Sequence, residues 1–295
     1  MSRPSISALI ELLKPVTWFP PMWAFACGVV STGAATDAQW PVIIGGALLA
    51  GPLVCATSQV ANDWFDRHVD AINEPNRPIP SGRVSGQWPV NLAILWSFLS
   101  ILVAIWLGPV VFWATLVALI LAWSYSAPPL RLKQNGWFGN AACAVCYEGL
   151  AWFTGAAVMT GGAMPNHRTL ALAALYSAGA HGIMTLNDFK SVDGDRIMNI
   201  KSLPVQYGVQ NAAFIACVFM ALPQVVVIAL LMRWGHWDHA GIVALLLGLQ
   251  ILLMRYFLED PRARATTYSA AGVSLFVIGM MTSAVALGSN AGVLR

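Results

Sequence analysis

The feature that most constrains this chain is a series of nine apolar runs, each about 20 residues long. A helix needs roughly 20 apolar residues to cross the ~30 Å hydrocarbon core of a bilayer. Lipid offers no water to backbone N–H and C=O groups, so these runs must be helices that satisfy such groups internally. The sequence therefore predicts nine transmembrane helices, at residues 18–34, 41–61, 89–107, 109–126, 137–158, 169–187, 210–232, 239–257 and 268–287.

The composition agrees with a chain that lies almost entirely in lipid. Hydrophobic residues make up 58% of the sequence and charged residues only 10%, whereas an average soluble domain is roughly 25% charged. No linker or low-complexity stretch divides residues 1–295. The predicted fold class is therefore all-α, a single-domain multi-pass transmembrane bundle. Residues 4–14 carry apolar side chains at helical spacing and are expected to form a short interfacial helix before the first span.

The distribution of Lys and Arg predicts the orientation of the bundle. With the N-terminus in the cytoplasm, thirteen of the sixteen basic residues fall in cytoplasmic segments, and only Arg168, Arg233 and Arg295 fall on the other side. Membrane proteins carry an excess of Lys and Arg in short cytoplasmic loops. We expect a protein of the cell inner or intracytoplasmic membrane with a cytoplasmic N-terminus. The net charge of +3 reflects this topology, so no nucleic-acid partner is expected.

Acidic residues are concentrated in two segments, 62–88 and 187–209, which the spans place as cytoplasmic loops. Each segment begins with an Asn–Asp pair at the end of an even-numbered span. In the first segment, the spacing i, i+3, i+7 would put Asp63, Asp66 and Asp70 on one face of a continued helix. Seven of the thirteen Asp and Glu residues lie in the two segments, namely Asp63, Asp66, Asp70, Glu74, Asp188, Asp193 and Asp195.

Carboxylates crowded in this way repel one another unless a cation lies among them. Mg²⁺ suits such a site, because it takes one or two carboxylates and completes its shell with waters and substrate phosphates. Interleaved Lys and Arg side chains would take the remaining phosphate charge. Asp188 and Asp195 are seven residues apart and would share a face if their segment stays helical. We therefore predict that Mg²⁺ binds among the acids of these two segments.

Several motifs carry a resemblance to a known family. Residues 62–70 are NDWFDRHVD, which matches NDxxDxxxD in full, and the later segment is NDFKSVDGDR, with Ser191 where a DxxxD pattern would have Asp. With segments 76–83 and 125–137, the chain resembles the UbiA-type intramembrane prenyltransferases. The second motif and the Pro-Pro loop are similar to the chlorophyll and bacteriochlorophyll synthase branch. Residues 147–155 are most like its bacteriochlorophyll members.

This resemblance implies a reaction and a set of site residues. The reaction is esterification of the propionate of bacteriochlorophyllide or chlorophyllide with a C20 prenyl group, from geranylgeranyl or phytyl diphosphate. The implied active site lies at the cytoplasmic ends of the helices. Catalytic roles are implied for Asp63, Asp66, Arg67 and Lys190. Ligation of Mg²⁺, with two ions expected, is implied for Asp63, Asp66, Asp70, Asp188, Asp193 and Asp195. Contacts with the diphosphate are implied for Asn62, Arg77, Arg83, Arg131, Lys133, Asn187, Arg196 and Lys201.

The acceptor chemistry gives weaker predictions for the pigment site. An ionised propionate can attack the prenyl C1 without a general base, so no catalytic His is expected. His181 could ligate the central Mg²⁺ of the pigment, or bond a neighbouring carbonyl instead. Glu148, a carboxylate in the middle of a span, could meet a polar ring substituent or serve packing inside the bundle. Tyr125 could line the cationic allyl centre or belong to the interfacial aromatic belt.

Two alternative functions stay open at this point. A quinone or haem prenyltransferase of the same family would share the motifs, and a transporter or pigment-binding membrane protein would share the bundle. Acids gathered at one membrane face favour an enzyme over a transporter, which would place polar residues near the bilayer midplane. The Pro-rich stretch 71–85 is expected to act as a lid over bound diphosphate. Association with other pigment-biosynthesis enzymes is also open.

Overall fold

Helices account for the regular structure of residues 3–289, the residues that the computed structural model describes. Within that range there is no β-strand, and one isolated bridge joins Asn135 to Lys201. The α-helices are α1 (Ile6–Leu13), α2 (Phe19–Ser31), α3 (Trp40–Leu48), α4 (Ala56–Asn73), α5 (Trp88–Leu107), α6 (Pro109–Ser126), α7 (Gly136–Ala144), α8 (Ala151–Met159), α9 (His167–Leu186), α10 (Val192–Ile197), α11 (Leu203–Tyr207), α12 (Val209–Arg233), α13 (Trp237–Glu259) and α14 (Pro261–Ser289). Short 3₁₀ segments are η1 (Pro15–Thr17), η3 (Leu132–Gln134) and η5 (Asn187–Lys190), and π-helical segments are η2 (Leu49–Cys55) and η4 (Val145–Leu150).

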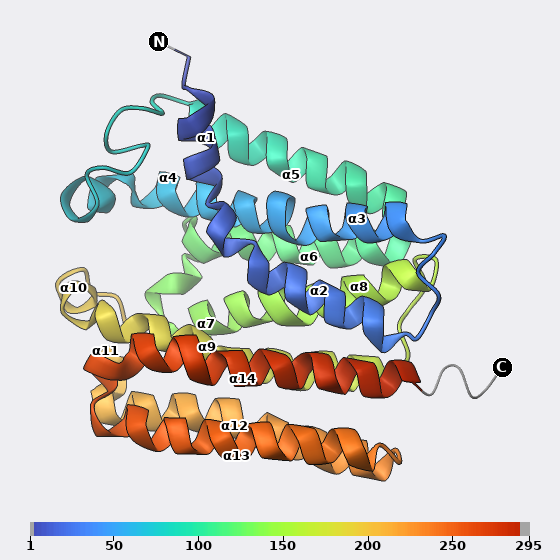
Figure 1. The fold of residues 1–295 in the computed structure, drawn as a ribbon. Helices are drawn as coiled ribbons and strands as arrows, with labels where there is room; N and C mark the ends of the chain where they lie inside the picture. Colours follow the sequence, from blue (N-terminus) through green and yellow to red (C-terminus); the bar gives the residue numbers. More distant parts are fainter. Residues whose placement is uncertain (1–2, 290–295) are drawn as a thin grey trace.

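The long helices run side by side as a bundle (Figure 1). Eight helical segments within residues 3–289 are long and apolar enough to span a membrane: Trp40–Ile72, Trp88–Leu107, Pro109–Ser126, Gly136–Met159, His167–Lys190, Val209–Arg233, Trp237–Glu259 and Pro261–Ser289. Two of them are composite, because α3, η2 and α4 run on continuously, as do α7, η4 and α8. The prediction of an all-α, multi-pass membrane bundle is confirmed.

The predicted span 18–34 forms α2, which is shorter than the other eight. Its 13 residues make a rod of about 20 Å, against the ~30 Å of a hydrocarbon core. Pro20 and Pro21 stand in its first turn, where missing N–H groups cost no helical hydrogen bond. Just past its end, Gly33 has a φ of 62°, a conformation that stops a helix. α2 is therefore a ninth apolar helix that stops short of a full span.

The core of the bundle is built where α2 crosses α8. A Cβ on Gly28 would lie 2.0 Å from the carbonyl oxygen of Trp152, and a Cβ on Gly155 would lie 2.0 Å from that of Phe25. Only glycine lets the two backbones approach so closely, which is how membrane helices commonly pack. The ring of Trp152 is fully buried and stacks on Tyr176 at 5.6 Å. The crossing therefore holds α2 against α8 in the hydrophobic core of the bundle.

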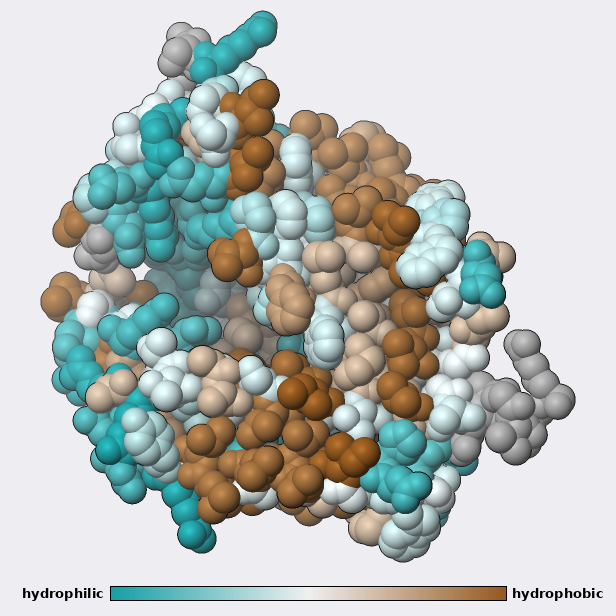
Figure 2. Space-filling model, in the orientation of Figure 1, coloured by the Kyte–Doolittle hydropathy of each residue, from teal (hydrophilic) through white to brown (hydrophobic). Residues whose placement is uncertain are grey.

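The surface of the molecule divides into an apolar band and a polar end. Large apolar side chains on the outer helices are more than 60% exposed, among them Trp113, Ile120 and Leu245. Such a surface is anomalous for a soluble monomer and expected for one in lipid. Figure 2 shows the apolar band over the middle of the molecule and hydrophilic side chains gathered at the end where α1, α10 and α11 lie in Figure 1. A recess opens between the polar segments at that end.

Candidate functional site

The two aspartate-rich segments meet across a cavity of about 620 Å³ at the polar end of the bundle. The first segment supplies the last turns of α4, and the second supplies η5 and α10. Both segments therefore contribute residues to one cavity. The cavity is lined by Asn62, Asp66, Val69, Asp70, Glu74, Arg77, Tyr125, Arg131, Lys133, Gln134, Gly136, Gly139, Asn140, Asn187, Asp188, Ser191, Asp195, Met198, Ile200 and Ser202.

The first aspartate motif is helical rather than part of a loop. α4 continues unbroken to Asn73, so the predicted loop 62–88 shrinks to residues 74–87. No helix breaker occurs before Glu74, and Pro75 disfavours the α conformation of the residue before it. Helical spacing therefore presents Asp63, Asp66 and Asp70 along one side of α4.

Asp63 is the most deeply buried of these acids, with 1% of its surface exposed. Lys14, from the chain just after α1, places Nζ 2.6 Å from Asp63 Oδ1. Arg77 bridges two acids, with Nη1 2.9 Å from Asp70 Oδ2 and 3.6 Å from Asp63 Oδ1. Burial lowers the pKa of the Arg77 guanidinium, but Asp70 and Asp63 outweigh burial and raise that pKa above its usual value. The guanidinium is therefore a permanent cation at the cavity wall.

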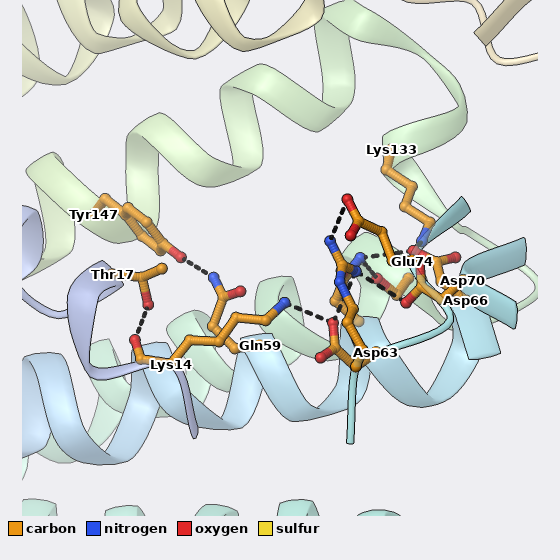
Figure 3. Close-up of polar contacts among 12 residues, drawn as sticks. Lys14, Thr17, Gln59, Asp63, Asp66, Asp70, Glu74, Lys133 and Tyr147 are labelled. Atoms are coloured by element: carbon orange, nitrogen blue, oxygen red, sulfur yellow. Dashed lines mark hydrogen bonds and ion pairs between the residues drawn. The ribbon is translucent and has the colours of Figure 1, made fainter. Parts of the chain in front are cut away.

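Asp66 is held by cations from the loop between α6 and α7. Lys133 forms a short hydrogen bond with Asp66 Oδ2, and Arg131 Nη2 lies 3.5 Å from Asp66 Oδ1. Asn62 Nδ2 donates to Asp66 Oδ2 at 3.1 Å and lies equally close to Ser126 Oγ. Lys14 and Lys133 thus approach the acids of α4 from opposite sides (Figure 3). Every carboxylate on this wall has a cation beside it.

The second wall departs from the predicted helical face. The chain after α9 forms the 3₁₀ turn η5, and α10 begins only at Val192, so Asp188 and Asp195 do not lie on one continuous helix. Both nevertheless line the cavity. Asn140 Nδ2 lies 3.4 Å from Asp188 Oδ2, and Ser191 Oγ donates to Asp195 Oδ2 at 3.1 Å. On this wall the carboxylates are held by neutral donors instead of cations.

Backbone hydrogen bonds join the loops that flank the two walls. Gly136 N donates to Lys201 O at 2.8 Å, and Lys201 N donates to Gln134 O at 2.9 Å. Arg131 adopts a left-handed φ of 39°, which non-glycine residues take mainly where surrounding structure enforces it. Its Nε is buried without a partner. A strained backbone thus presents an unsatisfied cationic donor beside the cavity, as an anion site requires.

Several predicted site residues lie elsewhere. Asp193 is 68% exposed and pairs with Arg262 at 2.5 Å on the surface, and this pairing lowers its pKa. Arg67 lies over the ring of Trp64 at 4.2 Å. Arg83 is exposed and pairs with Glu11 of α1. Lys190, Arg196 and Lys201 are exposed and do not line the cavity.

The three residues considered for the pigment have separate locations. Tyr125 lines the cavity and also an apolar pocket beneath it. Glu148 lies in η4 and is 4% exposed, with Oε2 buried and without a partner. His181 lies on α9 and is 5% exposed, with Nε2 3.3 Å from Trp137 O and Nδ1 buried without a partner. The structure does not bring these three side chains together in one cavity.

Small apolar pockets continue from the cavity into the bundle. Tyr125 is shared by the cavity and a pocket of about 20 Å³. That pocket shares Ala50, Val54 and Cys146 with another of about 30 Å³. Both pockets are flanked by the π-helical segments η2 and η4, a geometry often found at functional sites. Each pocket has room for only about one or two water molecules, so neither holds an apolar tail in this structure.

Sequence reasoning missed four residues that complete the site: Lys14, Ser126, Asn140 and Ser191. Lys14 lies 49 residues before its partner Asp63, and Asn140 lies 48 before Asp188. No local pattern links such pairs. An Asn inside an apolar span is the one available signal, because a buried amide needs hydrogen-bond partners.

The residues present fit a divalent cation bound together with an anion. Asp66 and Asp70 line the cavity on one side, and Asp188 and Asp195 line it on the other. Asp63 does not line the cavity, and its Oδ2 is buried without a partner beside them on α4. Within residues 3–289, no three Asp, Glu, His or Cys side chains are close enough to hold a metal ion by themselves. Mg²⁺ commonly uses one or two carboxylates and takes its other ligands from water and phosphate. Because the acids are divided between two walls, they suit a Mg²⁺ ion that binds together with a diphosphate.

Replacing Lys14 tests the Asp63 pair. Lys14→Met should lower the unfolding free energy of the metal-free protein by about 2 kcal/mol, because Asp63 stays buried with only Arg77 near it. Added Mg²⁺ should narrow this difference. Glu11→Gln is the matched control: it breaks an exposed pair with Arg83 and should cost less than about 1 kcal/mol. Thermal unfolding in detergent measures both, and equal losses would contradict the assignment.

Comparisons with known proteins agree with this geometry. Residues 18–287 match the UbiA prenyltransferase family. The bacteriochlorophyll synthase 33 kDa chain of Cereibacter sphaeroides is 52% identical over 97% of this chain and 94% of its own. The chloroplastic chlorophyll synthase of Avena sativa is 39% identical over 94% of this chain and 75% of its own.

A solved structure shares the fold. A UbiA homolog from Archaeoglobus fulgidus, bound to DMAPP and Mg²⁺, superimposes with a TM-score of 0.73 at 21% identity, over 94% of this chain and 99% of that one. The match to the family covers nearly the whole chain. It agrees with the helical architecture and with the meeting of the two aspartate-rich segments. The chain belongs to the UbiA prenyltransferase family and is a membrane enzyme that transfers prenyl groups.

Proposed function

We propose that this chain is a Mg²⁺-dependent bacteriochlorophyll synthase. It transfers a C20 prenyl group, geranylgeranyl or phytyl, from its diphosphate to the propionate of bacteriochlorophyllide or chlorophyllide. The observation that carries the proposal is the cavity of about 620 Å³, with acids on both walls and cations from two loops. The 52% identity with a bacteriochlorophyll synthase, against 39% with a chlorophyll synthase, supports the choice of pigment.

The side chains of the cavity divide the work of diphosphate binding. Asp66 and Asp70 on one wall, with Asp63 beside them on α4, and Asp188 and Asp195 on the other wall would hold two Mg²⁺ ions. Bound Mg²⁺ neutralises phosphate oxygens and stabilises the charge of the leaving group. Lys133, Arg131 and Arg77 donate to the remaining phosphate oxygens. This stabilisation grows as the C1–O bond breaks, so it accelerates the chemical step. Asp193 has no part in this assignment.

The acceptor needs no proton transfer. A carboxylic acid is ionised at neutral pH, so the propionate oxygen forms its bond to C1 while the diphosphate leaves with the bonding electron pair. Tyr125 lines both the cavity and the apolar pocket, and we place C1 of the prenyl group beside it. Loop 74–87 carries Arg77 into the cavity and is tied to α1 through Arg83 and Glu11. This loop acts as the lid that keeps water from the activated prenyl group.

The orientation is part of the proposal. We place the N-terminus, α1 and the diphosphate cavity on the cytoplasmic side, on the basis of the excess of Lys and Arg at that end. A cysteine-accessibility assay in intact cells tests it. A single cysteine placed in the short loop 234–236 should react with an impermeant reagent only from the side opposite the cavity.

A reconstitution assay tests the activity. Purified protein with geranylgeranyl diphosphate, Mg²⁺ and bacteriochlorophyllide should give esterified pigment and diphosphate. Removal of the metal with EDTA should abolish the product, and added Mg²⁺ should restore it, because the facing carboxylates cannot hold a diphosphate without a cation between them. Prenylation of 4-hydroxybenzoate in place of bacteriochlorophyllide would favour a quinone prenyltransferase. Product formation that is insensitive to EDTA would contradict the role of Mg²⁺.

A further inference from the structure

A second large space lies along the seam between the helix α7–η4–α8 and α9. It has a volume of about 520 Å³ and shares no lining residue with the diphosphate cavity. Exposed Val145, Ala174 and Ala178 show that it opens on the surface of two predicted spans. Most of its walls are small side chains, which leaves room for a flat body. We call it the seam groove; it is lined by Ala141, Ala144, Val145, Gly149, Leu150, Phe153, Leu170, Ala173, Ala174, Ser177, Ala178, His181 and Phe219.

One residue of the seam-groove lining, His181, has a ring nitrogen without a hydrogen-bond partner. His181 is 5% exposed, and its Nε2 lies 3.3 Å from the carbonyl oxygen of Trp137. A carbonyl only accepts hydrogen bonds, so Nε2 carries the proton and Nδ1 keeps its lone pair. Nδ1 is buried and has no partner. The rings of Trp137 and Phe219, at 5.3 Å and 4.7 Å, hold the imidazole in place. An oriented neutral imidazole of this kind is a ligand for a metal centre.

The seam groove ends beside the diphosphate cavity. His181 is its last lining residue on α9, and Asp188 of the cavity follows seven residues later, about 10 Å along a helix. On α7, Asn140 lines the cavity and Ala141 lines the seam groove. Asn140 bridges the two helices at this boundary, with Nδ2 3.2 Å from Thr185 Oγ1 and 3.4 Å from Asp188 Oδ2. A flat ligand in the groove can therefore extend an acidic arm to the reacting end of the diphosphate.

We propose that the seam groove is the docking site of the magnesium chlorin acceptor, with His181 Nδ1 as the axial ligand of its central magnesium. The inference rests on the proposed function and names where the pigment binds. The occupant follows from three observations: a lone pair without a partner, a wide apolar space at membrane depth, and an edge adjoining the diphosphate cavity. A lipid acyl chain would use the apolar walls but would leave Nδ1 without a partner.

The test measures binding of two pigments that differ only at the centre of the ring. Bacteriochlorophyllide and its metal-free form are titrated into the protein in nanodiscs, without prenyl diphosphate, and binding is followed by pigment absorption. The wild-type protein should bind the magnesium form about tenfold more tightly. In His181→Leu this difference should disappear. Ala178→Leu narrows the groove and should weaken binding of both pigments about tenfold. Gly248→Leu adds slightly more bulk on α13, where the site is open, and should change the binding of neither pigment.

Each outcome bears on the inference. Mg²⁺-dependent binding of geranylgeranyl diphosphate verifies that every variant is folded. Equal affinity of the wild-type protein for both pigments would overturn axial ligation, even if no His181 variant could be purified. Unchanged pigment binding in Ala178→Leu would show that the pigment does not bind in the seam groove, and would indicate that lipid occupies it. If either result is found and the wild-type protein still esterifies bacteriochlorophyllide, the inference about the seam groove fails and the proposed function stands. If the wild-type protein transfers no prenyl group to bacteriochlorophyllide, the proposed function itself fails.

Discussion

Asp66→Asn should lower prenyl transfer about 10³-fold, the largest effect expected of any single acid. Asp66 accepts from Asn62 and pairs with Lys133 and Arg131 at the cavity wall. The amide keeps the shape of the carboxylate but loses the charge that would hold Mg²⁺ against the diphosphate. Loss of one well-placed electrostatic group typically costs 10²–10³-fold in rate, and loss of a metal ligand adds to that. Esterified pigment formed from geranylgeranyl diphosphate is the measurement.

Asp193→Asn is the matched control for this prediction. It makes the same chemical change in the second aspartate-rich segment, but on a side chain that is 68% exposed and paired with Arg262. We expect activity within about threefold of the wild type, since exposed ion pairs contribute little. A loss in Asp193→Asn as large as that in Asp66→Asn would show that the second wall rearranges when metal binds. The metal role predicted for Asp193 from sequence would then be restored.

Lys133→Met should reduce kcat/KM about 10²-fold. In the wild-type enzyme, loss of the charge of Lys133 should also make kcat/KM fall at alkaline pH. The Lys133 side chain is 10% exposed, and burial lowers its pKa below the usual 10.5, with Asp66 opposing that shift. A lysine is charged only below its pKa. The wild-type kcat/KM, which reports ionisation of the free enzyme, should therefore begin to fall at a lower pH than an ordinary lysine would cause. Diphosphate binding is weakened once the charge is lost.

Two further variants separate charge from position at Lys133. Lys133→Arg keeps a cation at high pH, so the alkaline fall in kcat/KM should move to higher pH even if the absolute rate drops. Lys201→Met removes an exposed lysine outside the cavity and should leave the rate within about threefold. An unchanged alkaline limb in Lys133→Arg would show that a different group titrates there.

Some of the site was predictable because it depends on local spacing. The i, i+3, i+7 pattern of Asp63, Asp66 and Asp70 required only that α4 continue, and it does so to Asn73. The spacing of Asp188 and Asp195 was a weaker guide. The helix ends at Leu186, and the chain turns through η5 before α10 begins. Both acids still line the cavity, because the turn, and not a shared helical face, directs them there.

The sequence could not show which of the Lys and Arg residues reach the acids of the site. Thirteen of the sixteen Lys and Arg residues belong to the predicted cytoplasmic segments, so the topology rule selects all of them alike. Folding brings Lys14, Arg77, Arg131 and Lys133 to the acids. It leaves Lys190 exposed and outside the cavity. Sequence separation carries no information about such contacts.

The sequence by itself determined that this protein lies in lipid and that acids and bases are concentrated at one end of it. Apolar runs of span length can be satisfied only as helices in lipid, and repeated acids with interleaved bases suit metal and phosphate wherever they meet. Tertiary structure decided which of those charges meet, because helices far apart in the chain must pack before any distance between them is set. It also decided that α2 is short, that Asp193 faces away from the cavity, and that His181 keeps a free nitrogen in the seam groove.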